Sequence, residues 1–141
     1  MQKIILLVLS IFLLSYSNSN SEQVSPFTFL KVKSEKRGNN LNQMELYAVD
    51  KNTRSAALKD FCLQKKSEFM KDGSRMFSFV IFFDNKVNAG FPNNPFTAGF
   101  NEDVFSKHIK AMYSFNRLNG YSDLTVYEKN AWESLAKNIK I

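Results

Sequence analysis

The feature that most constrains this chain is the octet 76–83, in which seven of eight side chains are apolar. Apolar residues stand at both odd and even positions, so an extended chain here is hydrophobic on both faces. A strand with this pattern lies inside a sheet whose two faces are both covered. We therefore expect a central strand over 76–83 that forms the middle of the core.

The N-terminal segment is typical of a secretory signal peptide. Lys3 precedes a short apolar run over 4–14, and small polar residues follow over 15–19. A membrane-spanning helix needs about 20 apolar residues, so this run is too short for the alternative, a retained anchor. We expect cleavage after Ser17 or, preferably, Ser19, no transmembrane segment after cleavage, and export to a periplasm or the cell exterior.

The remaining chain is expected to fold as one domain. The hydrophobic content of 44% and the aromatic content of 14%, both for the whole chain, are too high for a disordered protein. About 120 residues suffice for a single core without covalent staples. The predicted organisation is a signal peptide over 1–19, a flexible lead-in over 20–26 and a single α+β domain over 27–141.

The numbers and positions of cysteine and asparagine residues indicate the cellular compartment in which the protein is expected. Cys62 is the only cysteine, so no intramolecular disulfide can form. None of the fifteen asparagines begins an Asn-x-Ser/Thr glycosylation site. These features favour a bacterial periplasm or exterior. We interpret Cys62 as a small buried hydrophobe; the alternatives are an intermolecular disulfide and a nucleophile paired with His108.

The formal net charge of +6 is spread over several clusters of lysines and arginines. Scattered lysines are the ordinary surface of a soluble protein, although they also attract anionic lipid headgroups or acidic polysaccharide. We expect no nucleic-acid partner for an exported protein. The partner that we do expect is another envelope or secreted protein.

The predicted order of elements is ββαβαβα. Alternation predicts strands, and apolar spacings of three and four predict helices. The elements are a hairpin over 27–49, a helix over 53–71, the strand over 76–83, a helix over 102–119, a strand over 122–127 and a helix over 130–139. The expected fold is thus an N-terminal β-hairpin followed by αβαβα, with helices packed on a sheet of about four strands. A parallel crossover is expected from 76–83 through 102–119 to 122–127.

The segment 84–101 is the strongest functional candidate. It has roughly seventeen residues, where connections in compact domains usually have about 4–6. It follows a central strand, a position where ligands often bind. We predict that Phe91, Phe96 and Phe100 line a mouth for an apolar or sugar-like ligand. The alternative is a loop whose phenylalanines pack into the core beneath it.

Polar candidates are few. His108, the sole histidine, is a possible general base beside Asp84, Asp103 or Asp123, but its place among apolar residues favours a packed imidazole. A metal site at His108 would need Glu102, Asp103 or a residue elsewhere, and no second histidine supplies the usual spacing. We expect no metal and no cofactor.

Two further side chains are candidates near the predicted helix ends. Arg117 is predicted to bind a carboxylate or phosphate of a ligand; the alternative is a cation that stabilises a helix end. Trp132 is interpreted as the core anchor of the last helix rather than as a platform for sugar stacking.

Two functions remain open at this point. The first is a small exported binding or interaction domain without catalysis, which uses the aromatic loop 84–101. The second is a small hydrolase or transferase with His108 as general base, which requires a carboxylate or nucleophile within about 3 Å of the imidazole.

Overall fold

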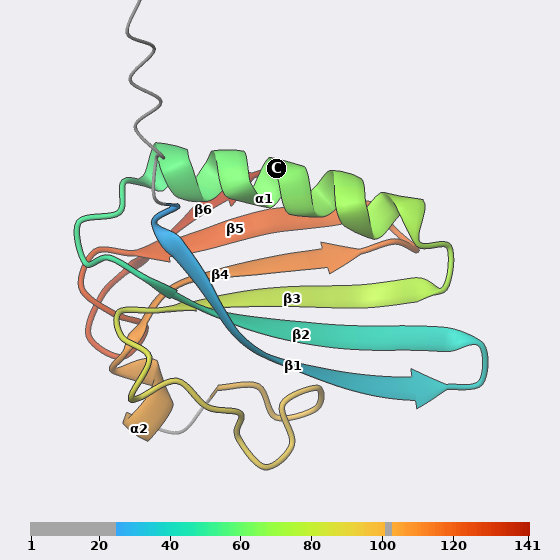
Figure 1. The fold of residues 1–141 in the computed structure, drawn as a ribbon, viewed down its shortest axis with the longest axis horizontal. Helices are drawn as coiled ribbons and strands as arrows, with labels where there is room; N and C mark the ends of the chain where they lie inside the picture. The colour runs from blue at the N-terminus through green and yellow to red at the C-terminus, as the bar shows by residue number, and fades with distance from the viewer. Residues whose placement is uncertain (1–24, 101–102) are drawn as a thin grey trace, which may run out of the picture.

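The computed structural model describes residues 25–100 and 103–141 and contains one six-stranded sheet (Figure 1). The strands follow one another across the sheet in chain order, β1 to β6, and only β2 and β3 run parallel. The elements are β1 (Phe27–Arg37), β2 (Asn40–Val49), α1 (Ser55–Lys71), β3 (Arg75–Phe83), α2 (Asp103–Ser106), β4 (Ile109–Asn116), β5 (Tyr121–Tyr127) and β6 (Ala136–Lys140).

This architecture corrects the expected fold class. The prediction of αβαβα with helices on about four strands is wrong, because the described chain has six strands in one mixed sheet and only two helices. The predicted signal peptide over 1–19 lies outside the described residues. No helix in the described part of the chain is long and apolar enough to cross a membrane.

The N-terminal hairpin is confirmed, with one irregularity. β1 and β2 pair antiparallel, with Phe29 opposite Tyr47 and Lys31 opposite Leu46. The register shift around Leu30 is a bulge, which reverses the side-chain alternation of the strand. Phe29 and Lys31 therefore lie on opposite faces, although simple alternation places them together.

The predicted first helix and central strand are also confirmed. α1 connects β2 to the parallel strand β3, so the crossover passes through α1 and not through the segment after β3. β3 lies between β2 and β4 and buries both of its faces. Val80 and Phe82 belong to the helix-side core beneath α1, and Ile81 and Phe83 belong to the loop-side core on the opposite face.

The predicted helix over 102–119 is wrong. In its described part, α2 takes up only four residues, and Ile109–Asn116 form the strand β4, antiparallel to both β3 and β5. Its side chains alternate between buried and half-buried, with Ala111, Tyr113 and Phe115 in the helix-side core. The apolar residues fit either period over this short stretch, and pairing with two neighbouring strands selects the extended form.

The predicted C-terminal helix is also wrong. Asn130 Oδ1 accepts hydrogen bonds from the backbone N–H groups of Trp132 and Glu133, as expected for a helix start. The chain makes only a turn there and continues as β6, which pairs with β5 and places Ile139 opposite Leu124. Because Ile139 packs against the helix-side core from this strand, extension of the sheet replaces the helix.

Candidate functional site

The segment after β3 covers the sheet face opposite α1 (Figure 1). Phe91, Phe96 and Phe100 are half-buried and pack against the loop-side core. The Phe96 ring lies 6.4 Å from that of Phe79, and the Phe100 ring lies 6.1 Å from that of Phe83. The phenylalanines of the loop thus form the cover of the sheet, as the alternative interpretation of this segment requires.

Gly90 shows how closely this cover is packed. A Cβ atom on Gly90 would lie 2.7 Å from Cε1 of Phe105, a distance that real side chains do not tolerate. Gly99 has a φ of +65°, a conformation that favours glycine. Both glycines allow the loop to follow the surface of the core. Gly90 lets the backbone approach the Phe105 ring closely, and Gly99 adopts a backbone conformation that other residues rarely adopt.

A cavity of about 400 Å³, the Trp132 cavity, opens where this loop meets the turn after β5. Phe100 comes from the loop, Met112 from β4, Tyr127 from β5 and Trp132 from the turn. The Trp132 side chain is 56% exposed, so it is not a core anchor, and the expected role for it is wrong.

Three of the seven residues that line the Trp132 cavity are aromatic. The Tyr127 hydroxyl donates to the Met112 sulfur at 3.8 Å, and burial raises the pKa of Tyr127 above that of a free phenol, so the hydroxyl stays neutral. The Lys107 Nζ lies 5.7 Å from the centre of the Trp132 ring, which places a cation beside the opening. These aromatic rings and the thioether, together with polar groups such as Ser106, are suited to a partly apolar ligand.

Phe96 lines a different cavity, of about 380 Å³, between β1 and the loop tip. Lys33 and Arg37 of β1 and two asparagines of the loop also line it. Phe91 lies near this region, with its ring 5.9 Å from the Lys33 Nζ. The structure therefore separates the three phenylalanines that the sequence analysis placed at one mouth.

His108 lies next to Asp84 at the base of the loop. The distance from His108 Nδ1 to Asp84 Oδ1 is 3.2 Å, and Asn88 Nδ2 lies 3.4 Å from the same nitrogen. The His108 side chain is 32% exposed and the Asp84 side chain 17%. The imidazole is thus not sealed inside the core, and it meets one of the three carboxylates proposed for it. Asp123 lies opposite Ser114, toward the other end of β4.

Cys62 is free and fully buried in the helix-side core. Burial raises the pKa of its thiol to about 12, so the thiolate is scarce at neutral pH. Because Asp84 holds His108 at the base of the loop, on the other side of the sheet, the proposed Cys62–His108 pair has no support.

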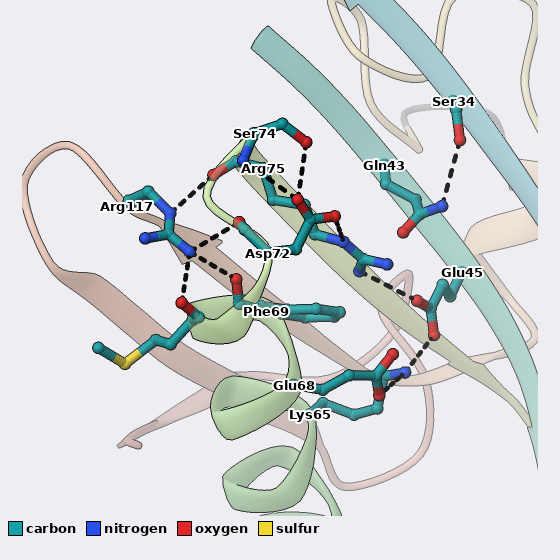
Figure 2. A network of polar contacts seen from close by, with 11 residues as sticks. Ser34, Gln43, Glu45, Lys65, Glu68, Phe69, Asp72, Ser74, Arg75 and Arg117 are labelled. Atoms are coloured by element: carbon teal, nitrogen blue, oxygen red, sulfur yellow. Dashed lines mark hydrogen bonds and ion pairs between the residues drawn. The ribbon is translucent and has the colours of Figure 1, made fainter.

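Arg117 is occupied by the C-terminal end of α1 (Figure 2). Its Nη2 donates to the carbonyl oxygens of Phe69, Met70 and Asp72, each at 2.8 Å, and its Nε donates to that of Arg75 at 3.0 Å. The last carbonyls of a helix have no partner within it, so this guanidinium satisfies them. The geometry favours the helix-end interpretation of Arg117 over ligand binding. The helix that it stabilises is α1, and not the helix that was predicted over 102–119.

A buried ion network beneath α1 escaped the sequence analysis (Figure 2). Glu45 of β2 and Lys65 of α1, both buried, meet at 2.8 Å, and the Tyr47 hydroxyl donates to Glu45 at 3.0 Å. Lys65 also meets the exposed Glu68 at 2.7 Å. Two features of the sequence could have indicated this network. Glu45 is a charged residue within an apolar strand, and Lys65 interrupts the apolar stripe of the helix.

Within the described residues, no group of three or more histidine, cysteine, aspartate or glutamate side chains is arranged to hold a metal ion. A comparison with known protein families, curated proteins and solved structures finds no significant match to this chain.

Proposed function

We propose that this protein is a small exported binding domain without catalytic activity, which holds a partly apolar ligand in the Trp132 cavity. The observation that carries the proposal is the exposure of Trp132 beside Phe100, Met112 and Tyr127. Large exposed aromatic side chains that border a cavity are costly to leave in water and favour a binding site. The long loop is then needed because it supplies Phe100 to the rim.

Intrinsic fluorescence tests this proposal directly, because Trp132 is the only tryptophan in the chain. We expect the amphiphilic dye anilinonaphthalene sulfonate to bind saturably and to change Trp132 emission by energy transfer. A neutral methyl glycoside, titrated in parallel, distinguishes a sugar-like ligand from an apolar one. Absence of a saturable change with either probe would contradict the proposal.

Variants locate the binding to the cavity. Ala131→Leu fills the cavity and removes no core side chain, so we expect affinity to fall about tenfold or more with the far-UV spectrum unchanged. Leu135→Ser is the matched control, because Leu135 is exposed in the same turn and does not line the cavity. Equal affinity in both variants would place the dye elsewhere.

Export is part of the same proposal and rests on the apolar segment 4–14 and the small residues after it. The test is mass spectrometry of the N-terminus of protein isolated from its native host. A terminus near residue 20 in the envelope or medium is expected, and an intact Met1 in the cytosol would overturn this part of the proposal.

A second candidate, a small hydrolase or transferase, is favoured by the 3.2 Å contact between His108 and Asp84. A carboxylate at Nδ1 orients an imidazole so that Nε2 can act as a base. The described residues include no serine, threonine or cysteine side chain bonded to His108. Turnover of nitrophenyl esters, phosphates or glycosides that His108→Gln abolishes would establish this function in place of the first.

A further inference from the structure

The strand β1 forms an open edge of the sheet. Among the described residues it pairs with β2 on one side only, and eight of its eleven residues are exposed and none is buried. An edge strand presents unpaired backbone N–H and C=O groups that can pair with another extended chain. A long exposed edge strand therefore needs either protection or a partner.

The charge along β1 is strongly positive. The strand carries Lys31, Lys33, Lys36 and Arg37 but a single carboxylate, Glu35. Arg37 neutralises Glu35 at 2.9 Å, and none of Lys31, Lys33 and Lys36 forms an ion pair with another described residue. After the bulge, Lys31 and Lys33 both lie on the loop-side face of the sheet, and Lys36 lies on the helix-side face.

Lysines and a bulge also protect an edge from unwanted pairing, but protection does not explain the apolar side chains of β1. Phe29 is 53% exposed and Val32 is 48% exposed, on the same face as Tyr47 and Glu45 of β2. An additional strand beside β1 would cover both side chains. Apolar and cationic positions on one edge define a partner strand with complementary apolar and acidic positions.

A second copy of this chain does not have that composition at its edges. The other open edge of the sheet, β6, carries Lys137 and Lys140 and no carboxylate. Pairing β1 with β1, or β1 with β6, would bring lysines together, which is unfavourable. The charges thus select against self-association through the sheet edges.

We propose that β1 docks an extended acidic segment of another protein, which adds a seventh strand to the sheet. Its carboxylates meet Lys31 and Lys33 on the loop-side face, its backbone completes the hydrogen bonds of the edge, and its apolar side chains cover Phe29 and Val32 on the helix-side face. This surface is separate from the Trp132 cavity, so each proposal can fail without the other.

The probe is a synthetic peptide of about ten residues, one strand in length, in which glutamate alternates with valine. A peptide with lysine in place of glutamate is the comparison. We expect the acidic peptide to bind, the lysine peptide not to bind, and hydrogen exchange to slow at β1 amides but not at β6 amides. Binding without slower exchange in β1 would show only non-specific attraction and would overturn the proposal.

Charge reversal gives a matched pair of variants. Lys31→Glu with Lys33→Glu should weaken binding of the acidic peptide about tenfold or more and should allow the lysine peptide to bind. Lys137→Glu with Lys140→Glu changes the net charge equally on the other edge and should leave the affinity unchanged. Equal weakening in both variants, or protection of β1 through self-association without peptide, would overturn the proposal.

Discussion

The imidazole of His108 lies 3.2 Å from the carboxylate of Asp84, and the backbone N–H of Asp84 donates to the His108 carbonyl at 2.9 Å. These two contacts join the ends of the segment that covers the loop-side core. The pair therefore has a structural role at the base of the loop, whether or not it also performs acid–base chemistry.

Replacing His108 by alanine is expected to loosen this segment. Because the pair is partly exposed, we expect the free energy of unfolding to fall by only about 0.5–1 kcal/mol. Hydrogen exchange at residues 85–100 should accelerate more than exchange in β3. Lys86→Ala, an exposed change in the same loop, is the control, and unchanged exchange in His108→Ala would contradict the structural role.

Removal of the Glu45 carboxylate is expected to destabilise the protein severely. Glu45→Ala leaves the buried Lys65 with only the exposed Glu68, and breaking a buried pair in this way costs about 3–5 kcal/mol. Glu68→Ala, which removes the exposed partner of the same lysine, should cost less than about 1 kcal/mol. Urea unfolding measures both values, and similar losses would show that burial does not govern this network.

A joint replacement tests the same network from the other side. Glu45→Met combined with Lys65→Met removes both buried charges and keeps apolar volume, so it should recover most of the stability that Glu45→Ala loses. A double variant no more stable than Glu45→Ala would indicate that Glu45, through Lys65 and its further contacts with Tyr47 and Arg75, contributes net stability.

Stability is expected to fall at alkaline pH. Burial raises the pKa of Cys62 from 9.0 to about 12, and burial raises the pKa of Tyr113 to about 12 as well. Between pH 9 and 12 the unfolded chain releases protons that the folded chain retains, so rising pH favours unfolding, by up to about 1.4 kcal/mol per pH unit and group. Urea unfolding below pH 9 and at about pH 10.5 should show the fall, and Cys62→Ala should reduce it.

Substitution of Arg117 by lysine is expected to weaken the end of α1. A lysine lacks the planar fork that reaches four carbonyls, so we expect a loss of about 2 kcal/mol and faster exchange in the last turn of the helix. Lys71→Ala removes another cation from that turn and should change stability by less than about 0.5 kcal/mol. Unchanged stability in Arg117→Lys would leave the residue available for a ligand.

Sequence patterns correctly predicted the elements in which the spacing of apolar residues matches the surfaces that are buried in the structure. The apolar octet 76–83 indicated a central strand, and the spacing of Leu58, Cys62 and Phe69 indicated α1. The segment 105–115 misled the analysis, because its aromatic and aliphatic residues fit a helical stripe as well as a strand. Only the hydrogen bonds from β3 and β5 decide between the two.

The candidate site was partly predictable for the same reason. Unusual length identified the loop 84–101, and Asp84 was one of three carboxylates, with Asp103 and Asp123, that were expected beside His108. The meeting of Phe100 with Trp132, 32 positions later in the chain, was not predictable, because it requires the turn after β5 to fold back toward the loop.

A hydrophobic centre, a covering helix, an N-terminal hairpin and the absence of an intramolecular disulfide could all be predicted from the sequence, since each depends on neighbouring residues or on simple counts. The tertiary structure decided that the second half of the chain extends the sheet, that Arg117 caps α1 and that a bulge reverses β1. These features depend on backbone groups and side chains that come from distant parts of the chain. These contacts stabilise the protein only once the sheet has assembled, so no local sequence pattern predicts them.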